Sequence, residues 1–306
     1  MHPGHDVSDE LMTSYSNPVK PVAQSSTRTR VITALVLAPV MIVGIFILPL
    51  KPFAFFIAFI ATVGAWEWAN IAGYQKNWSR LLYAFIVFAC LYISARILRV
   101  HPEWKIWFLA AGTLWWIVAF AMVKHYPGGT GVWNARVVRA FLGICVLIPM
   151  WVGFMHLKEE PHSSVLIIYV MLVVWGADTG AYFAGRRWGN SKLAPKVSPG
   201  KSWAGFWGGL ATTLLLALLA CVAFDHWIER IDLLEAVKII IITLLTMVIS
   251  VLGDLVESMM KRHRGIKDSS SLLPGHGGVL DRIDSMAAAV PVFAFMMLLL
   301  EWRLVA

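Results

Sequence analysis

Residues 31–50, VITALVLAPVMIVGIFILPL, form a run of apolar residues that contains no charge. A helix of about 20 residues is long enough to cross the hydrocarbon core of a bilayer, which is roughly 30 Å thick. Since a helix satisfies its own backbone polar groups in lipid, the run predicts a transmembrane helix. Pro39 inside it does not contradict this, because neighbouring groups in a membrane protein can compensate for a missing backbone hydrogen bond.

The rest of the chain repeats this pattern. Of its 306 residues 58% are hydrophobic and 14% charged, where a soluble domain has about 25% charged residues, and the mean hydropathy is +0.70. The sequence therefore predicts an all-α polytopic integral membrane protein with about nine transmembrane helices. The predicted spans are residues 31–50, 53–72, 80–99, 105–123, 137–156, 164–185, 203–224, 236–260 and 286–303.

The distribution of Lys and Arg predicts the orientation. Cytoplasmic loops carry an excess of both residues, and with the N-terminus inside, eighteen of the 26 fall on the cytoplasmic side and eight outside. We therefore expect a cytoplasmic N-terminus. The two most basic loops, residues 186–202 and 261–285, then face the cytoplasm together.

The chain divides into a polar start and an apolar body. Residues 1–28 are too polar for the apolar region of a signal peptide, so we expect a disordered cytoplasmic tail, followed by a membrane domain over residues 29–306. The net charge of +8 is explained by basic loops and needs no nucleic acid. The three cysteines lie in apolar runs without metal-ligand spacing, and no disulfide framework is expected.

Acidic residues inside the predicted spans are the first functional signal. Glu67, Asp178, Asp254 and Glu257 lie within or at the ends of spans, where a carboxylate costs about 3 kcal/mol on insertion scales and normally faces a partner or a cavity. We interpret Glu67, taken alone, as one half of an ion pair with a nearby Lys or Arg. Asp254 and Glu257 are three residues apart and share a helix face.

Asp281 and Asp284 repeat that spacing in the polar segment IKDSSSLLPGHGGVLDRID (266–284). In the predicted topology Asp178, Asp254, Asp281 and Asp284 reach the cytoplasmic membrane face together. Carboxylates without Cys or paired His favour a hard cation, Mg²⁺ or Mn²⁺. These four residues are the candidate metal ligands, Asp178 being the weaker one.

Basic residues surround these acids, and bound phosphate bridged by Mg²⁺ would neutralise both sets. The Gly-rich PGHGG (274–278) would let the backbone approach such an anion closely. The basic residues are Lys192, Lys196, Lys201, Lys261, Arg262, Arg264, Lys267 and Arg282.

Two partial motifs are rejected. SPGKS (198–202) ends like a P-loop, but the required first Gly is Pro195, and we expect no strand before it. His276 in GHGG resembles part of an esterase oxyanion loop, yet the chain has no GxSxG elbow. For His276 a phosphate or nucleotide contact, a general acid and a structural loop residue all remain open.

The segment SMMKRHRGIKDSSSLLPGHGGVLDRID (258–284) closely resembles the signature of phosphatidate cytidylyltransferases, also called CDP-diacylglycerol synthases. Ser258, Lys261-Arg262, Lys267-Asp268, Leu273-Pro274, His276-Gly277-Gly278 and Asp281-Arg282-Ile283-Asp284 all match. VVWGADTGAYFAGRRWG, KLAPKVSPGKSWAGFWGG and SVLGDLVESMMKR are similar to upstream segments of that family. The resemblance covers residues 29–306, and the start of the chain is longer than is usual there.

The resemblance implies the transfer of a cytidylyl group from CTP to phosphatidate, which gives CDP-diacylglycerol and pyrophosphate. It also implies Mg²⁺, a monovalent cation such as K⁺, a homodimer in the bacterial inner membrane and an active site on its cytoplasmic side. The candidate catalytic residues are Lys201, Lys267, His276, Asp281 and Arg282. The candidate phosphate and substrate contacts are Lys192, Ser198, Ser258, Lys261, Arg262, Gly277 and Gly278.

Two other functions were weighed against this one. Intramembrane acids and Gly-containing spans also suit an ion-coupled transporter, but the polar residues gather at one face and no paired half-repeats are found. A different lipid-phosphate enzyme, such as a polyprenol kinase, would share the location without the 27-residue match.

Overall fold

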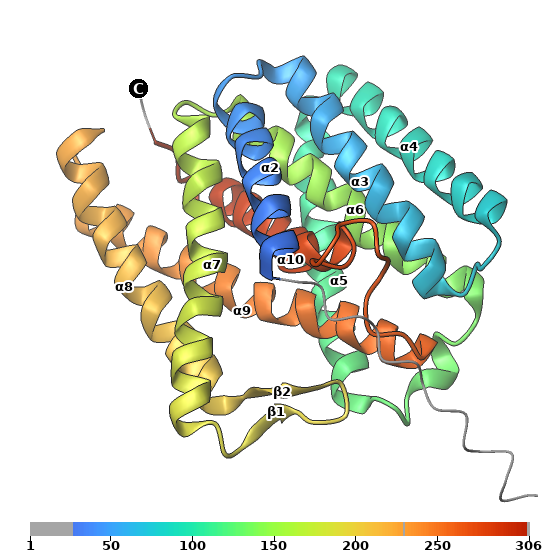
Figure 1. Cartoon of the computed structure of the whole chain (residues 1–306). Helices are drawn as coiled ribbons and strands as arrows, with labels where there is room; N and C mark the ends of the chain where they lie inside the picture. The colour runs from blue at the N-terminus through green and yellow to red at the C-terminus, as the bar shows by residue number, and fades with distance from the viewer. Residues whose placement is uncertain (1–26, 229, 305–306) are drawn as a thin grey trace, which may run out of the picture.

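The computed structural model describes residues 27–228 and 230–304, and its helices follow the apolar runs (Figure 1). A two-stranded hairpin and two short 3₁₀ turns, Pro102–Trp104 and Thr130–Val132, lie between helices. The elements in chain order are α2 Thr27–Phe46, α3 Leu50–Ala72, α4 Asn77–Val100, α5 Lys105–His125, α6 Arg136–Glu159, α7 Ser163–Trp188, β1 Lys192–Ala194, β2 Ser198–Ser202, α8 Trp203–Trp227, α9 Leu233–Arg264 and α10 Leu280–Leu299.

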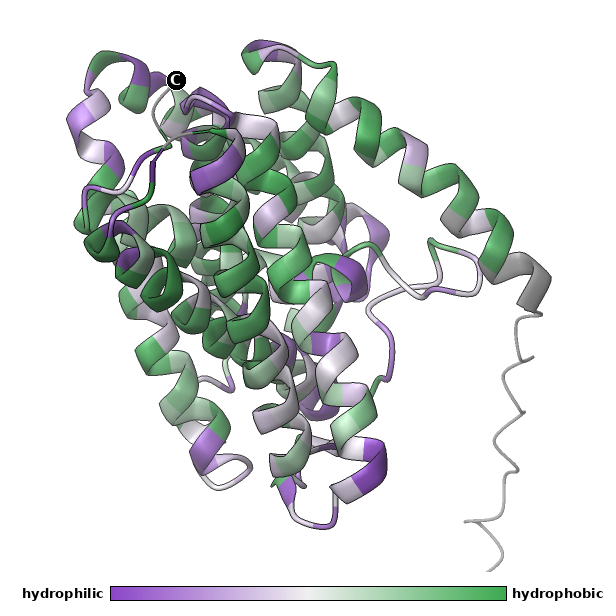
Figure 2. Ribbon diagram, turned by 90° about the vertical axis from the view of Figure 1, so that its left-hand side faces the viewer, coloured by the Kyte–Doolittle hydropathy of each residue, from purple (hydrophilic) through white to green (hydrophobic). Residues whose placement is uncertain are grey.

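Eight of the helices in the described part of the chain, α3 to α10, are long and apolar enough to cross a membrane. Hydrophobic residues follow their length, and hydrophilic residues gather mainly at helix ends and in loops (Figure 2). The polytopic all-α prediction is confirmed to that extent. The apolar part of α2 is shorter, Val31–Phe46, so a ninth span stays a prediction. The expected disordered tail lies outside the described residues, except that Thr27 and Arg28 belong to α2.

Helix α10 forms the centre of the bundle and packs against α9, α6 and α5. Small side chains allow this close packing: Ala287, Ala288 and Ala289 are fully buried. A Cβ added at Gly253 of α9 would lie 2.7 Å from the Cβ of Ala288. Because lipid tails are as apolar as Leu, helices in membranes associate through such close contacts.

Residues 192–202, which we expected to be a loop, form an antiparallel hairpin, with Lys192 opposite Ser202. The statement that SPGKS has no strand is therefore wrong, since Ser198–Ser202 is β2. Ser202 then caps α8, its Oγ accepting a hydrogen bond from Gly205 N at 3.1 Å. The hairpin thus fixes Lys201 directly before a helix start.

The last helix begins earlier than residue 286, where we placed it. Leu280 starts α10, so Asp281 and Asp284 lie in its first two turns instead of in the preceding loop. Helix α9 ends at Arg264 with Gly265 in a left-handed conformation (φ 74°). Residues 265–279, here called the signature loop, connect these two helix ends.

Candidate active site

Glu67 of α3 is a fully buried carboxylate that binds the signature loop. It accepts hydrogen bonds from the hydroxyls of Ser269 and Ser270 and from the backbone N–H groups of Val279 and Leu280, at 2.6–3.3 Å. The two amides belong to the start of α10, where helix geometry leaves N–H groups without a partner and the dipole favours an anion. The expected ion pair of Glu67 is thus replaced by four neutral donors.

Asp281 binds the same loop from the helix side. Its carboxylate accepts hydrogen bonds from Ser269 N, Ser269 Oγ and Gly278 N, the shortest at 2.7 Å. Lys261 of α9 also donates to it at 2.6 Å. Since four donors already use both oxygens, the geometry favours a role for Asp281 in holding the loop over that of a metal ligand.

The glycines of PGHGG approach these two carboxylates closely. Gly278 N donates to Asp281, and a Cβ at Gly278 would meet Ser269 Oγ and lie 2.6 Å from Glu67 Oε1. Gly277 has φ +82°, and a Cβ there would lie 2.7 Å from Asp281 Oδ2. The close backbone approach that we expected toward a bound phosphate is therefore made, at these two glycines, toward the protein's own acids.

A second group of acids lies along one face of α9 and reaches α10. Lys201 pairs with Asp254 at 2.8 Å, and Ser258 Oγ donates to Asp254 at 3.0 Å. Glu257 pairs with Lys261 at 3.0 Å. Asp284 interacts electrostatically with Asp254 and Glu257, which brings three acids together.

Asp178 lies near this group from α7. It is exposed and interacts electrostatically with both Lys201 and Asp254. The structure therefore brings all the predicted acids to one region, but each of them interacts with different partners. Glu257, which we did not name as a site residue, lies among them. The i, i+3 spacing with Asp254 was its sequence signal.

The fit of this group to a divalent cation can be tested on its own atoms. Within the described residues, no three His, Cys, Asp or Glu side chains form a ready-made metal cluster. Glu257 Oε1, however, is buried without a hydrogen-bond partner, beside Asp254 and Asp284. A buried carboxylate oxygen left unpaired is costly, and a hard cation that prefers oxygen ligands would satisfy it. Adjacent carboxylates supply the ligand type that Mg²⁺ and Mn²⁺ prefer, and a divalent cation at this group stays a prediction.

The predicted phosphate contacts fall into two groups. In the first group, Lys201 and Lys261 form ion pairs with acids, and Ser258 donates a hydrogen bond to Asp254. Exposed cations without an ion-pair partner in residues 27–228 and 230–304 include Lys192, Arg262 and Lys267. Ser198 is half-buried in β2 opposite Ala194. The charges of the second group are not offset by an acid in the described part of the chain, which suits the binding of an anion.

Arg282 and His276 interact with each other. Arg282 Nε and Nη2 donate to the backbone carbonyl of His276 at 2.9 and 2.7 Å. His276 Nδ1 is buried and has no partner among the described atoms. Arg282 thus shapes PGHGG, and both side chains lie at the loop that faces the acids.

A serine- and glycine-rich loop held by buried acids, with acids and free cations beside it at the end of membrane helices, defines a site for phosphate chemistry at a membrane surface. Residues 28–300 match the sequence profile of the cytidylyltransferase family. The chain belongs to this family.

Curated relatives agree with this assignment. A phosphatidate cytidylyltransferase of Pseudomonas aeruginosa is 46% identical over 277 residues, covering 90% of this chain and 98% of the relative. One of Haemophilus influenzae is 39% identical over 284 residues, covering 88% and 97%. One of Bacillus subtilis is 38% identical over 164 residues, covering 52% and 59%.

Proposed function

We propose that this protein is a phosphatidate cytidylyltransferase that transfers the cytidylyl group of CTP to phosphatidate. A phosphate oxygen of phosphatidate attacks the α-phosphorus of CTP, the bond from that phosphorus to the β-phosphate oxygen breaks, and pyrophosphate leaves. The observation that carries the proposal is the signature loop between Glu67 and Asp281, beside the acids of α9, in a chain of the cytidylyltransferase family.

The attacking oxygen is already an anion, so no Ser or Cys nucleophile is required. The task of the protein is to position two polyanions and to neutralise their charge. Lys267 and Arg262 are exposed and unpaired, which suits contacts to the phosphates of CTP. Lys201, beside Asp254, would contact the phosphate of the lipid.

Asp254, Glu257 and Asp284 would hold a divalent cation, with Asp178 nearby. When bound, such an ion neutralises phosphate charge and stabilises the leaving pyrophosphate. Asp281 acts through the loop, because its oxygens hold Ser269 and Gly278 in place. A monovalent cation such as K⁺ belongs to the proposal through the family resemblance alone.

The orientation is also a proposal. The excess of Lys and Arg supports a cytoplasmic side for the loops that follow α3, α5, α7 and α9, and the bacterial relatives support the inner membrane. CTP is a cytoplasmic nucleotide, so the site would face its supply. A homodimer remains part of the proposal.

An assay of purified protein with labelled CTP and phosphatidate tests the function. We expect Mg²⁺-dependent formation of CDP-diacylglycerol, and a loss of at least about a hundredfold in Asp254→Asn and Asp284→Asn, since a lost catalytic charge interaction is worth ~3 kcal/mol. Glu235→Gln, on the same helix but paired with Lys238, is the control. Absence of CDP-diacylglycerol, or full activity in both Asp variants, would contradict the proposal.

A further inference from the structure

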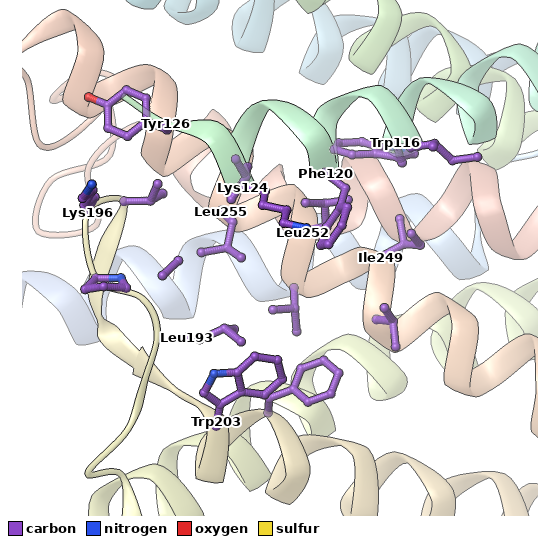
Figure 3. Close-up of a pocket in the computed structure, with 18 residues that line it drawn as sticks. Trp116, Phe120, Lys124, Tyr126, Leu193, Lys196, Trp203, Ile249, Leu252 and Leu255 are labelled. Carbon is purple, nitrogen blue, oxygen red and sulfur yellow. The ribbon is translucent and has the colours of Figure 1, made fainter. Parts of the chain in front are cut away.

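A cavity of about 760 Å³ lies against α9, enclosed by α5, the hairpin and the start of α8 (Figure 3). Its walls are apolar over almost their whole extent, with Trp116, Phe120, Trp203 and Phe206 as the largest side chains. The volume is in the range of small-molecule sites, roughly 300–1,000 Å³. None of these residues takes part in the contacts that hold the signature loop.

Exposed apolar side chains of two helices long enough to cross a membrane line the cavity. Ile117 and Phe120 of α5 and Trp203 of α8 line it and are 66%, 58% and 45% exposed. In a bilayer the medium next to these side chains is hydrocarbon. An acyl chain can therefore enter from the side without crossing water.

Two lysines add a charge to this apolar space. Lys124 extends from α5 over the cavity and Lys196 lies on the hairpin at its edge (Figure 3). Both are exposed, and neither has an ion-pair partner in the described part of the chain. The positive-inside pattern accounts for basic residues at this membrane face, but the placement beside an apolar cavity selects a ligand with an acyl chain and an anionic head.

The cavity also lies next to the acids of the active site. Val251, Leu252 and Leu255 of α9 line it. Asp254 immediately precedes Leu255 and lies about 100° around the helix axis from it, at 3.6 residues per turn. Lys201, the ion-pair partner of Asp254, donates to the carbonyl of Val251 at 3.4 Å. A lipid phosphate at Lys201 would thus have an apolar cavity directly beside it.

We propose that this cavity holds one acyl chain of phosphatidate while its phosphate lies at Lys201, and that Lys124 and Lys196 attract the anionic lipid as it approaches. The assignment rests on the proposed function. In this proposal the cavity determines the preference for acyl-chain length, whereas other groups bind the phosphate and the nucleotide.

The test fills the cavity and varies the lipid. Val248 lines it and is 38% exposed, so Val248→Trp adds a large side chain to its wall. We expect the KM for dioleoyl phosphatidate to rise at least about tenfold, the scale of discrimination in an apolar pocket. The KM for CTP and the turnover of dihexanoyl phosphatidate should remain unchanged. Ile117→Trp, on the opposite wall, should have the same effect.

Ile241→Trp is the matched control, since it lies seven residues earlier on the same face of α9, is 42% exposed and does not line the cavity. It should leave both lipids unaffected. Equal loss for short and long chains, or no loss for either, in both filled variants would overturn the acyl-chain assignment. Absence of CDP-diacylglycerol with the unmodified protein would instead contradict the proposed function.

Discussion

At the scale of single residues, Glu67 explains why a polar loop can be ordered beside a hydrocarbon core. It is fully buried, and its four donors all come from the signature loop or the start of α10. A buried carboxylate is tolerated when hydrogen bonds satisfy it. Glu67 is therefore a positioning residue, which acts on the reaction through the loop.

Glu67→Gln should lower both stability and activity. The amide nitrogen of Gln is a donor and cannot accept from Ser or backbone N–H groups, so at least one buried donor loses its partner, at a cost of about 1–3 kcal/mol. We expect a lower melting temperature in detergent and a fall in kcat of at least about tenfold. Glu103→Gln, at an exposed position on a connecting turn, is the control. Unchanged melting and turnover in Glu67→Gln would show that the loop does not depend on this carboxylate.

At the scale of elements, the signature loop and the first turn of α10 carry two kinds of cation. Arg282 donates twice to the His276 carbonyl and so helps to shape the loop. Lys267 is exposed and has no ion pair within the described residues. Arg282 thus stabilises the structure of the loop, whereas Lys267 binds substrate in the proposed function.

Lys267→Ala and Arg282→Ala should therefore differ. Removing Lys267 should raise the KM for CTP by about tenfold or more, the scale of a charge-assisted contact, with an unchanged melting temperature. Arg282→Ala should lower the melting temperature as well as the activity. Arg282→Lys should remain impaired, because an ammonium does not reproduce the planar fork of two donors. Identical behaviour of the Lys267 and Arg282 variants in both assays would contradict this division.

At the scale of the whole molecule, the eight helices α3 to α10 are each long and apolar enough to cross a bilayer, and eight successive crossings would place four connections on one side. The connections after α3, α5, α7 and α9 share that side whether or not α2 crosses. The hairpin lies at the bottom of Figure 1. The acids of α9, the hairpin and the signature loop can meet because they belong to the same side.

Cysteines introduced on the two sides should label differently in intact cells after Cys90, Cys145 and Cys221 are replaced. Ser191→Cys and Ser271→Cys, at exposed positions, should resist a membrane-impermeant thiol reagent. His162→Cys, exposed in the connection after α6, should react. Ser271 is preferable to Ser270, whose hydroxyl binds Glu67. Reaction at Ser191 or Ser271 from outside would reverse the proposed orientation.

The sequence by itself determined the helices and the region of the site. Apolar runs long enough for a bilayer predict α3 to α10, with the largest error at the start of α10. The prediction works because a helix satisfies its own backbone polar groups in lipid. The i, i+3 acids and the signature segment likewise located the site, since both are local patterns.

Tertiary structure decided what each polar group binds. Asp281 accepts from Gly278 N, which the sequence alone assigns to phosphate, Glu67 accepts from Val279 N, and Arg282 binds a backbone carbonyl. The hairpin that positions Lys201 and the cavity beside α9 likewise arise only from packing. These features depend on which groups from distant segments meet, and that is set by the close contact of α10 with α9 and by the register of the loop, not by any local periodicity.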